Sequence, residues 1–136
     1  MEFKDNIPIY LQIEDLIRNN IVNNEYHLGD KIPSVRELSL ELSVNINTVQ
    51  KAISNLVDDG IVITKRGQGN FVTEDVSVID KLRDDQIHEI VEEMYYALSA
   101  LNLDNDQIIS KVKTYIEKKG ELKNGKRNRN KGFIIQ

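Results

Sequence analysis

The side chains best placed for chemistry in this 136-residue chain are amides, hydroxyls and a few cations, gathered over some thirty positions in its first half. The candidates are Arg36, Asn45, Asn47, Thr48, Gln50, Lys51, Lys65, Arg66 and Gly67. Asn and Gln pair bidentately with adenine, Thr bonds a base or touches a thymine methyl, and Lys and Arg contact phosphates. These residue types together indicate a surface that binds double-stranded DNA.

A helix must carry the amide and hydroxyl groups. Apolar residues recur at helical spacing on one face, and polar residues fall opposite them. The apolar set is Val49, Ala52, Ile53, Leu56 and Val57, and the polar set is Asn47, Thr48, Gln50, Lys51, Ser54 and Asn55. An earlier helix is predicted to begin at Ser34, since Glu37 three residues later completes a capping box. Residues 43–47 break the helical pattern with polar, poor helix-forming residues and predict the turn between the two helices.

A basic hairpin follows the second helix. Gly60 ends that helix, because glycine tolerates the left-handed conformation. Two β-prone runs, 61–64 and 70–73, then flank a tip that contains Lys65, Arg66 and Gly67. The two cations suit phosphates or a minor groove, and glycine lets the backbone approach closely. A polar helix alone would more often be a solvated surface; a basic hairpin directly after it favours a winged helix-turn-helix.

This pattern resembles the DNA-binding domain of the GntR family of bacterial transcription regulators. The matching residues are Pro33-Ser34-Val35-Arg36, Thr48-Val49-Gln50-Lys51-Ala52, Gly60 and Gly67-Gln68-Gly69-Asn70-Phe71-Val72, with Pro8 to Gln12 upstream. The resemblance covers residues 7–73 and implies the DNA contacts assigned above. Many family members have arginine where this chain has Ile46, and often another where it has Gln50, which implies a binding site richer in A·T.

The second part of the chain predicts two amphipathic helices that need a partner. A heptad-like seam runs to Leu101, and a second apolar face ends at Gly120. The seam and face comprise Ile87, Ile90, Val91, Met94, Tyr95, Leu98, Leu101, Ile108, Ile109, Val112 and Ile116. We expect these residues to form a homodimer, with packing onto the chain's own first domain as the alternative. A short two-helix segment is similar to the YtrA-like subfamily of GntR regulators.

Composition and charge limit the classes of protein to which this chain can belong. The chain has no cysteine and a net charge of −4, although residues 118–136 carry seven basic side chains and one acidic one. No apolar run is long enough for a membrane span, and the first residues do not resemble a secretory signal. His88 near Glu89, Glu92 and Glu93 is better explained as a solvated helix face than as a metal site. We expect a soluble cytoplasmic protein that is not an enzyme and holds no metal or cofactor.

The predicted fold is mainly α with a small β-hairpin. A winged helix-turn-helix domain occupies residues 1–75, a short two-helix dimerisation segment residues 76–120, and a flexible basic tail residues 121–136. The predicted function is a sequence-specific DNA-binding regulator, a repressor acting as a homodimer on a two-fold operator near a promoter. The alternative is a winged-helix protein-interaction module without specific DNA binding. The sequence leaves a small-molecule effector open, although the two-helix segment shows no evident pocket.

Overall fold

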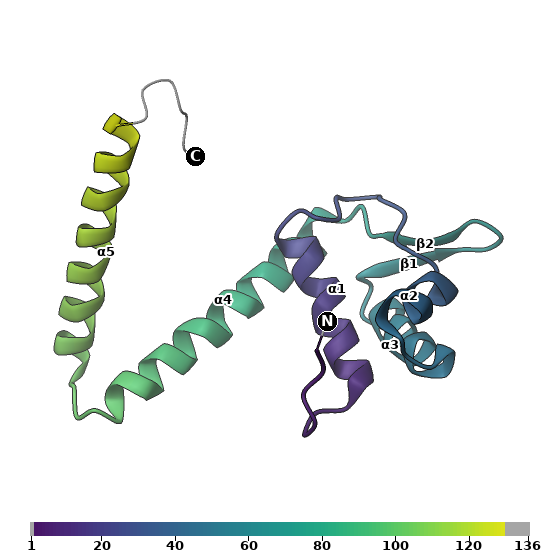
Figure 1. Cartoon of the computed structure of the whole chain (residues 1–136), viewed down its shortest axis with the longest axis horizontal. Helices are drawn as coiled ribbons and strands as arrows, with labels where there is room; N and C mark the ends of the chain where they lie inside the picture. Colours follow the sequence, from purple (N-terminus) through teal and green to yellow (C-terminus); the bar gives the residue numbers. More distant parts are fainter. Residues whose placement is uncertain (1, 130–136) are drawn as a thin grey trace. The chain divides into compact units, whose positions relative to one another are not determined.

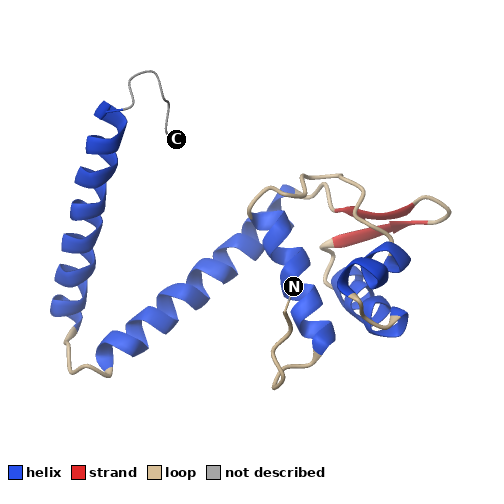
Figure 2. Cartoon of the chain, in the orientation of Figure 1, coloured by secondary structure: helices blue, strands red, loops and turns tan. Residues whose placement is uncertain are grey.

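The computed structural model describes the backbone of residues 2–129 and the side chains of residues 2–122. Helices and one hairpin make up the described chain (Figures 1 and 2). In order they are α1 (Ile9–Val22), α2 (Val35–Leu42), α3 (Ile46–Asp58), β1 (Val62–Lys65), β2 (Gly69–Val72), α4 (Val76–Ser99) and α5 (Asn105–Arg129). The chain divides into a winged unit, Met1–Ile87, and a helical unit, His88–Gln136. The fold class predicted from sequence is confirmed.

The winged unit closes a hydrophobic core within one chain. Helix α3 packs against α1, α2 and β1 (Figure 1). Its apolar face makes these contacts. The buried side chains are Ile13, Ile17, Ile21, Ile32, Leu38, Val49, Ala52, Ile53, Leu56, Ile61, Val62, Val72, Ile79 and Leu82. Burial of this many apolar side chains is the main source of folding free energy in a domain of this size. The apolar face predicted for the second helix is confirmed.

The start of each helix in the helix-turn-helix is defined by a side-chain cap. Ser34 Oγ accepts from the backbone N–H of Glu37 at 3.0 Å, and Glu37 Oε1 accepts from the N–H of Ser34 at 3.2 Å. The predicted capping box is therefore present. Donation by Ser34 stabilises the ionised form of Glu37 and lowers its pKa. Helix α3 begins in the same way, with Asn45 Oδ1 accepting from the N–H of Asn47 at 2.7 Å.

The wing is an antiparallel hairpin extended by a third segment. Val62 pairs with Val72 and Lys65 with Gly69, which leaves residues 66–68 as the turn. Gly67 has a φ of +76°, a conformation that favours glycine. On the other edge of β2, Lys31 forms a bridge with Phe71. The backbone of the segment before α2 therefore extends the wing.

The first turns of α4 belong to the winged unit. Ile79 and Leu82 are buried in its core, and Arg83 Nη2 donates to the carbonyl of Val22 at 3.3 Å. Gln86 Nε2 also donates to Asn19 Oδ1 at 2.9 Å. The winged unit ends at Ile87 in the structure, whereas the sequence analysis placed the domain boundary after residue 75. The periodicity of a long helix carries no mark at the point where its packing partner changes.

The helical unit contains the end of α4 and all of α5. Asp104 caps α5, since its Oδ1 accepts from the N–H of Gln107 at 2.8 Å. The predicted helix end at Gly120 is wrong: α5 continues to Arg129 and Gly120 does not adopt a positive φ. Residues 121–129, predicted as part of a flexible tail, are therefore helical. Glycine permits a helix end but does not require one. The remaining tail, residues 130–136, lies outside the described residues.

Candidate nucleic-acid interface

The N-terminal end of α3 presents polar side chains to solvent. Asn45, Asn47 and Gln50 are exposed, and Thr48 is half-buried beside them. Ile46 opens the helix as an exposed apolar side chain. Free N–H groups and the helix dipole at such an end favour a phosphate, while amide and hydroxyl groups suit base edges. The structure thus brings four of the predicted contact residues together on one accessible end.

Two residues of this helix have partners within the chain. Gln50 Nε2 donates to Ser54 Oγ at 3.1 Å, one turn further along the helix. Lys51 Nζ lies 4.0 Å from the centroid of the Tyr10 ring, so a cation–π contact holds the ammonium toward α1. Lys51 is nonetheless exposed. Its position suits a flanking phosphate better than a base in the centre of a site.

The wing supplies exposed cations at its tip. Lys65 ends β1 and Arg66 begins the turn, where the N–H of Gln68 donates to the carbonyl of Lys65 at 2.8 Å. Lys65 Nζ also lies 4.5 Å from the Phe71 ring centroid. Within residues 2–122, neither Arg36 nor Arg66 forms an ion pair. Both guanidinium groups are therefore available to phosphate oxygens.

Lys31 is a cation of the wing that the sequence analysis missed. It is exposed, and its bridge to Phe71 places it on the edge of β2. Its Cε lies 2.9 Å from the point where a side chain at Gly69 would begin, so the absence of a Cβ there leaves room for Lys31. The two residues are far apart in sequence, and only the pairing of segments brings them together. Lys31 thus joins Lys65 and Arg66 as a third cation.

Asn55 was predicted to lie on the exposed polar face of α3, and this is wrong. The residue is half-buried and its Nδ2 donates to Glu14 Oε2 at 2.9 Å. Glu14 in turn accepts from Arg18, which also pairs with Asp59 at the C-terminal cap of α3. Helical periodicity separates polar from apolar residues but cannot reveal a polar partner on a neighbouring helix.

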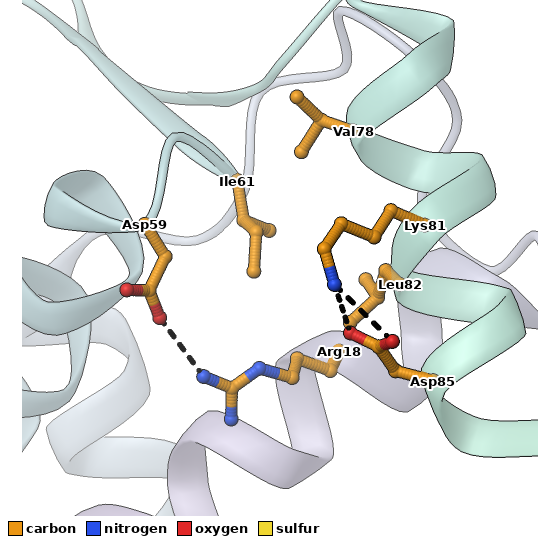
Figure 3. A pocket seen from close by; sticks show the side chains of 7 residues that line it. All are labelled: Arg18, Asp59, Ile61, Val78, Lys81, Leu82 and Asp85. Carbon is orange, nitrogen blue, oxygen red and sulfur yellow. Dashed lines mark hydrogen bonds and ion pairs between the residues drawn. The ribbon is translucent and has the colours of Figure 1, made fainter. Parts of the chain in front are cut away.

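A hollow of about 380 Å³ lies beside this network, between α1, the end of α3 and the first turns of α4 (Figure 3). Ile61, Val78 and Leu82 give it an apolar lining. Its charged groups pair with one another: Arg18 with Asp59 at 3.2 Å and Lys81 with Asp85 at 2.9 Å. The hollow therefore offers a ligand no charged group that lacks a partner.

The predicted dimerisation residues remain largely exposed in a single chain. Ile87, Ile90, Val91, Met94, Tyr95, Leu101, Ile109 and Ile116 are exposed, and Leu98 and Val112 are half-buried. Ile108 differs, since it is only 6% exposed and already packs within one chain. It lines an apolar hollow of about 380 Å³ together with Met94, Ile109, Val112 and Ile116. The helical unit thus presents an apolar surface rather than a closed core.

The described residues meet neither the requirements of a metal site nor those of a membrane-spanning helix. No group of three or more His, Cys, Asp or Glu side chains is placed to hold a metal ion there. His88 Nε2 instead pairs with Glu92 at 2.9 Å along one helix. No described helix is both long enough and apolar enough to span a bilayer.

Comparison with known proteins identifies relatives along the chain. The model of the gntR family of bacterial regulatory proteins matches residues 9–72. The uncharacterised transcriptional regulator YhcF of Bacillus subtilis is 39% identical over 116 residues, which are 85% of this chain and 96% of that protein. The transcriptional repressor YtrA of Bacillus subtilis is 39% identical over 71 residues, 52% of this chain and 55% of that protein.

Solved structures show the same architecture. A GntR family transcriptional regulator from Listeria monocytogenes is 39% identical and matches with a TM-score of 0.76, covering 82% of this chain and 98% of that one. The AraR DNA-binding domain in complex with operator ORX1 is 30% identical, with a TM-score of 0.50, covering 53% of this chain and 93% of that chain. These relatives are transcription regulators and not enzymes.

Proposed function

This chain belongs to the gntR family of bacterial regulatory proteins, and we propose that it is a repressor that binds a two-fold operator near a promoter as a homodimer. Bound there, the dimer would exclude RNA polymerase from the promoter. Its place of action would be the bacterial cytoplasm, where the chromosome lies. A winged domain that binds only proteins is the alternative.

One observation carries the proposal: an exposed polar helix end and an exposed basic wing occur in the same unit. The N-terminal end of α3 presents Asn47, Thr48 and Gln50, whose groups match base edges. The wing presents Lys31 and Arg66, whose charges match phosphates but carry no sequence information. Recognition and positioning would thus come from different elements.

The homodimer follows from the helical unit and from the small number of cations. Met94, Ile109 and Ile116 expose apolar surface that the described residues of one chain do not cover. Four or so phosphate contacts per subunit would give weak, salt-sensitive binding, and a second subunit on a second half-site would strengthen it. Helix-turn-helix dimers place their reading helices about one DNA turn, roughly 34 Å, apart. We therefore expect a palindromic operator.

The base preference should lie toward A·T pairs. Ile46 presents an apolar side chain at the start of α3, which suits a thymine methyl. Gln50 suits adenine, and neither residue matches the guanine contact that arginine makes.

The YtrA-like assignment from sequence agrees with the similarity to YtrA of Bacillus subtilis.

Selection from a random duplex library tests the proposal. The wild-type protein should enrich a palindromic sequence, and fluorescence anisotropy should show preference for that sequence over a scrambled duplex. Gln50→Ala should reduce the preference, because it removes a base contact. Arg66→Ala should weaken both duplexes alike and flatten the salt dependence by about one phosphate contact.

Lys81→Ala is the matched control for loss of a cation. Lys81 is exposed, lies on α4 within the winged unit and pairs with Asp85 at 2.9 Å. Its removal should leave the salt slope unchanged. Absence of any enriched sequence, together with binding that ignores salt, would contradict the proposal and favour the protein-interaction module.

A further inference from the structure

Glu14 is a buried carboxylate whose contacts reach the helix that we propose reads DNA. Its side chain is 5% exposed. One oxygen accepts from Asn55 Nδ2 at 2.9 Å and the other from Arg18 Nη2 at 3.2 Å. Arg18 extends the network to Asp59, 3.2 Å away, at the C-terminal cap of α3 (Figure 3). Helix α1 therefore holds the last turn of α3 at two points.

These hydrogen bonds restrain α3 in a way that the core does not. The contacts of Val49, Ala52 and Ile53 are apolar, and the hydrophobic effect has no direction. Hydrogen bonds weaken steeply when their angle changes. A small rotation of α3 about its axis would therefore break directional bonds at Asn55 in addition to disturbing the apolar packing.

A rotation at Asn55 would be passed directly to the reading end. Asn55 follows Thr48 by seven residues, about two helical turns, so both lie on nearly the same side of α3. A short α-helix rotates as one body. An error in the orientation of Asn55 would thus turn Thr48 away from its position, and would turn Gln50 on another side of the same helix by the same angle.

Stability alone gives little reason for this network. Moving a carboxylate out of water carries a large desolvation cost, and apolar replacements of buried ion pairs are often neutral or stabilising. Directional restraint is what such a network supplies and a fully apolar contact does not. We propose that Glu14 is a positioning residue for base recognition, which acts through Asn55, Arg18 and Asp59 to orient α3. This inference rests on the proposed function.

The test compares two carboxylates on the same helix that share a partner. Glu14→Ala breaks the network, whereas Asp15→Ala removes the same charge from a side chain that is 71% exposed and, among residues 2–122, pairs with Arg18 alone. The probes are the duplex enriched by wild-type protein from a random library and a scrambled duplex. Affinities are measured by anisotropy at a temperature where circular dichroism shows each variant to be folded.

Glu14→Ala should lower the ratio of the two affinities about tenfold and change the scrambled affinity less than twofold, because phosphate contacts tolerate a rotated helix better than base contacts. Asn55→Ala should have the same effect, and the double variant should be no worse than either single one. Asp15→Ala should keep the ratio. Glu14→Gln keeps an acceptor for Asn55 and should restore part of the ratio lost in Glu14→Ala.

Ile17→Val controls for stability alone, since it removes a methyl group from the same helix within the core. It should lower the melting temperature and keep the ratio. The inference is overturned if Glu14→Ala and Asn55→Ala are destabilised but retain the wild-type ratio, or if both affinities fall in parallel. Failure of wild-type protein to enrich any sequence would instead reject the proposed function, and this inference with it.

Discussion

The two units of this chain bury their apolar side chains to very different degrees. The winged unit places isoleucines, leucines and valines from α1, α3, the hairpin and α4 in one closed core. The helical unit leaves most of its large apolar residues in solvent, and Ile108 is its one buried apolar side chain among the described residues. A unit that closes its own core folds independently, whereas one with an open apolar surface gains stability from a partner.

The difference also separates two kinds of exposed apolar residue. Leu40 on α2 is 76% exposed and stands among polar neighbours, which is common on protein surfaces. Ile90 is 66% exposed but has Val91 and Met94 beside it on the same helix. Contiguous apolar surface marks an interaction site, and single residues do not.

The largest effect should come from the core of the winged unit. Ile53→Ala removes a fully buried side chain of α3 and should lower the free energy of unfolding by about 2–5 kcal/mol. Urea denaturation at several protein concentrations measures this. The loss should be independent of concentration, and a concentration-dependent loss would show that the winged unit is not self-contained.

Self-association should depend on the helical unit. Ile90→Asp places a charge in the proposed interface and should weaken dimerisation about 100-fold, as expected when a buried contact receives an unpaired charge. Sedimentation velocity over a concentration series measures the dissociation constant. Leu40→Asp is the matched control and should leave it unchanged. Equal effects of the two variants would show that the apolar surface around Ile90 is no more an interface than the surface around Leu40.

DNA binding should respond to the cations of the wing and not to those of the helical unit. Lys31→Ala should weaken enriched and scrambled duplexes alike and reduce the slope of log affinity against log salt by about 0.9. Lys111→Ala, which changes an exposed lysine of α5, should keep the wild-type slope. A reduced slope in Lys111→Ala and an unchanged slope in Lys31→Ala would show that the helical unit, and not the wing, contacts DNA.

Removing a helix cap should destabilise the two units by similar amounts. The two losses should appear in different experiments. Ser34→Ala and Asp104→Ala each remove the acceptor of a helix N-cap, at about 1 kcal/mol. The Ser34→Ala loss should be visible at any protein concentration. The Asp104→Ala loss should appear as weaker self-association, because α5 gains its stability in the proposed dimer. A concentration-independent Asp104→Ala loss would argue against that coupling.

The smallest effect should be a loss of stability in acid that arises in the winged unit. The N–H of Ser34 lowers the pKa of Glu37 below its ordinary 4.5, and the N–H of His27 and the hydroxyl of Ser77 lower those of Asp30 and Asp75 below 3.8. Each contribution is present above the ordinary pKa and is lost as the pH falls through the lowered one. Urea midpoints at pH 6 and pH 3 should therefore differ less in Glu37→Gln than in wild type.

Local signals in the sequence predicted the reading elements well. The capping box at Ser34, the apolar face of α3 and the turn at Gly67 all depend on residues within a few positions of one another. Such patterns have one favourable local conformation, so they can be recognised without a structure. The residue roles in DNA and dimer contacts remain predictions that the experiments above address.

The sequence by itself determined that α2 begins at the Ser34 capping box, which face of α3 is apolar, and which family the pattern resembles. Only the tertiary structure decided that α4 joins the winged unit up to Ile87, that Lys31 lies at the wing, and that Asn55 turns to Glu14. The tertiary structure also shows that α5 continues past Gly120. Contacts between residues far apart in sequence leave no periodic trace, because their partners are chosen by packing rather than by local conformation.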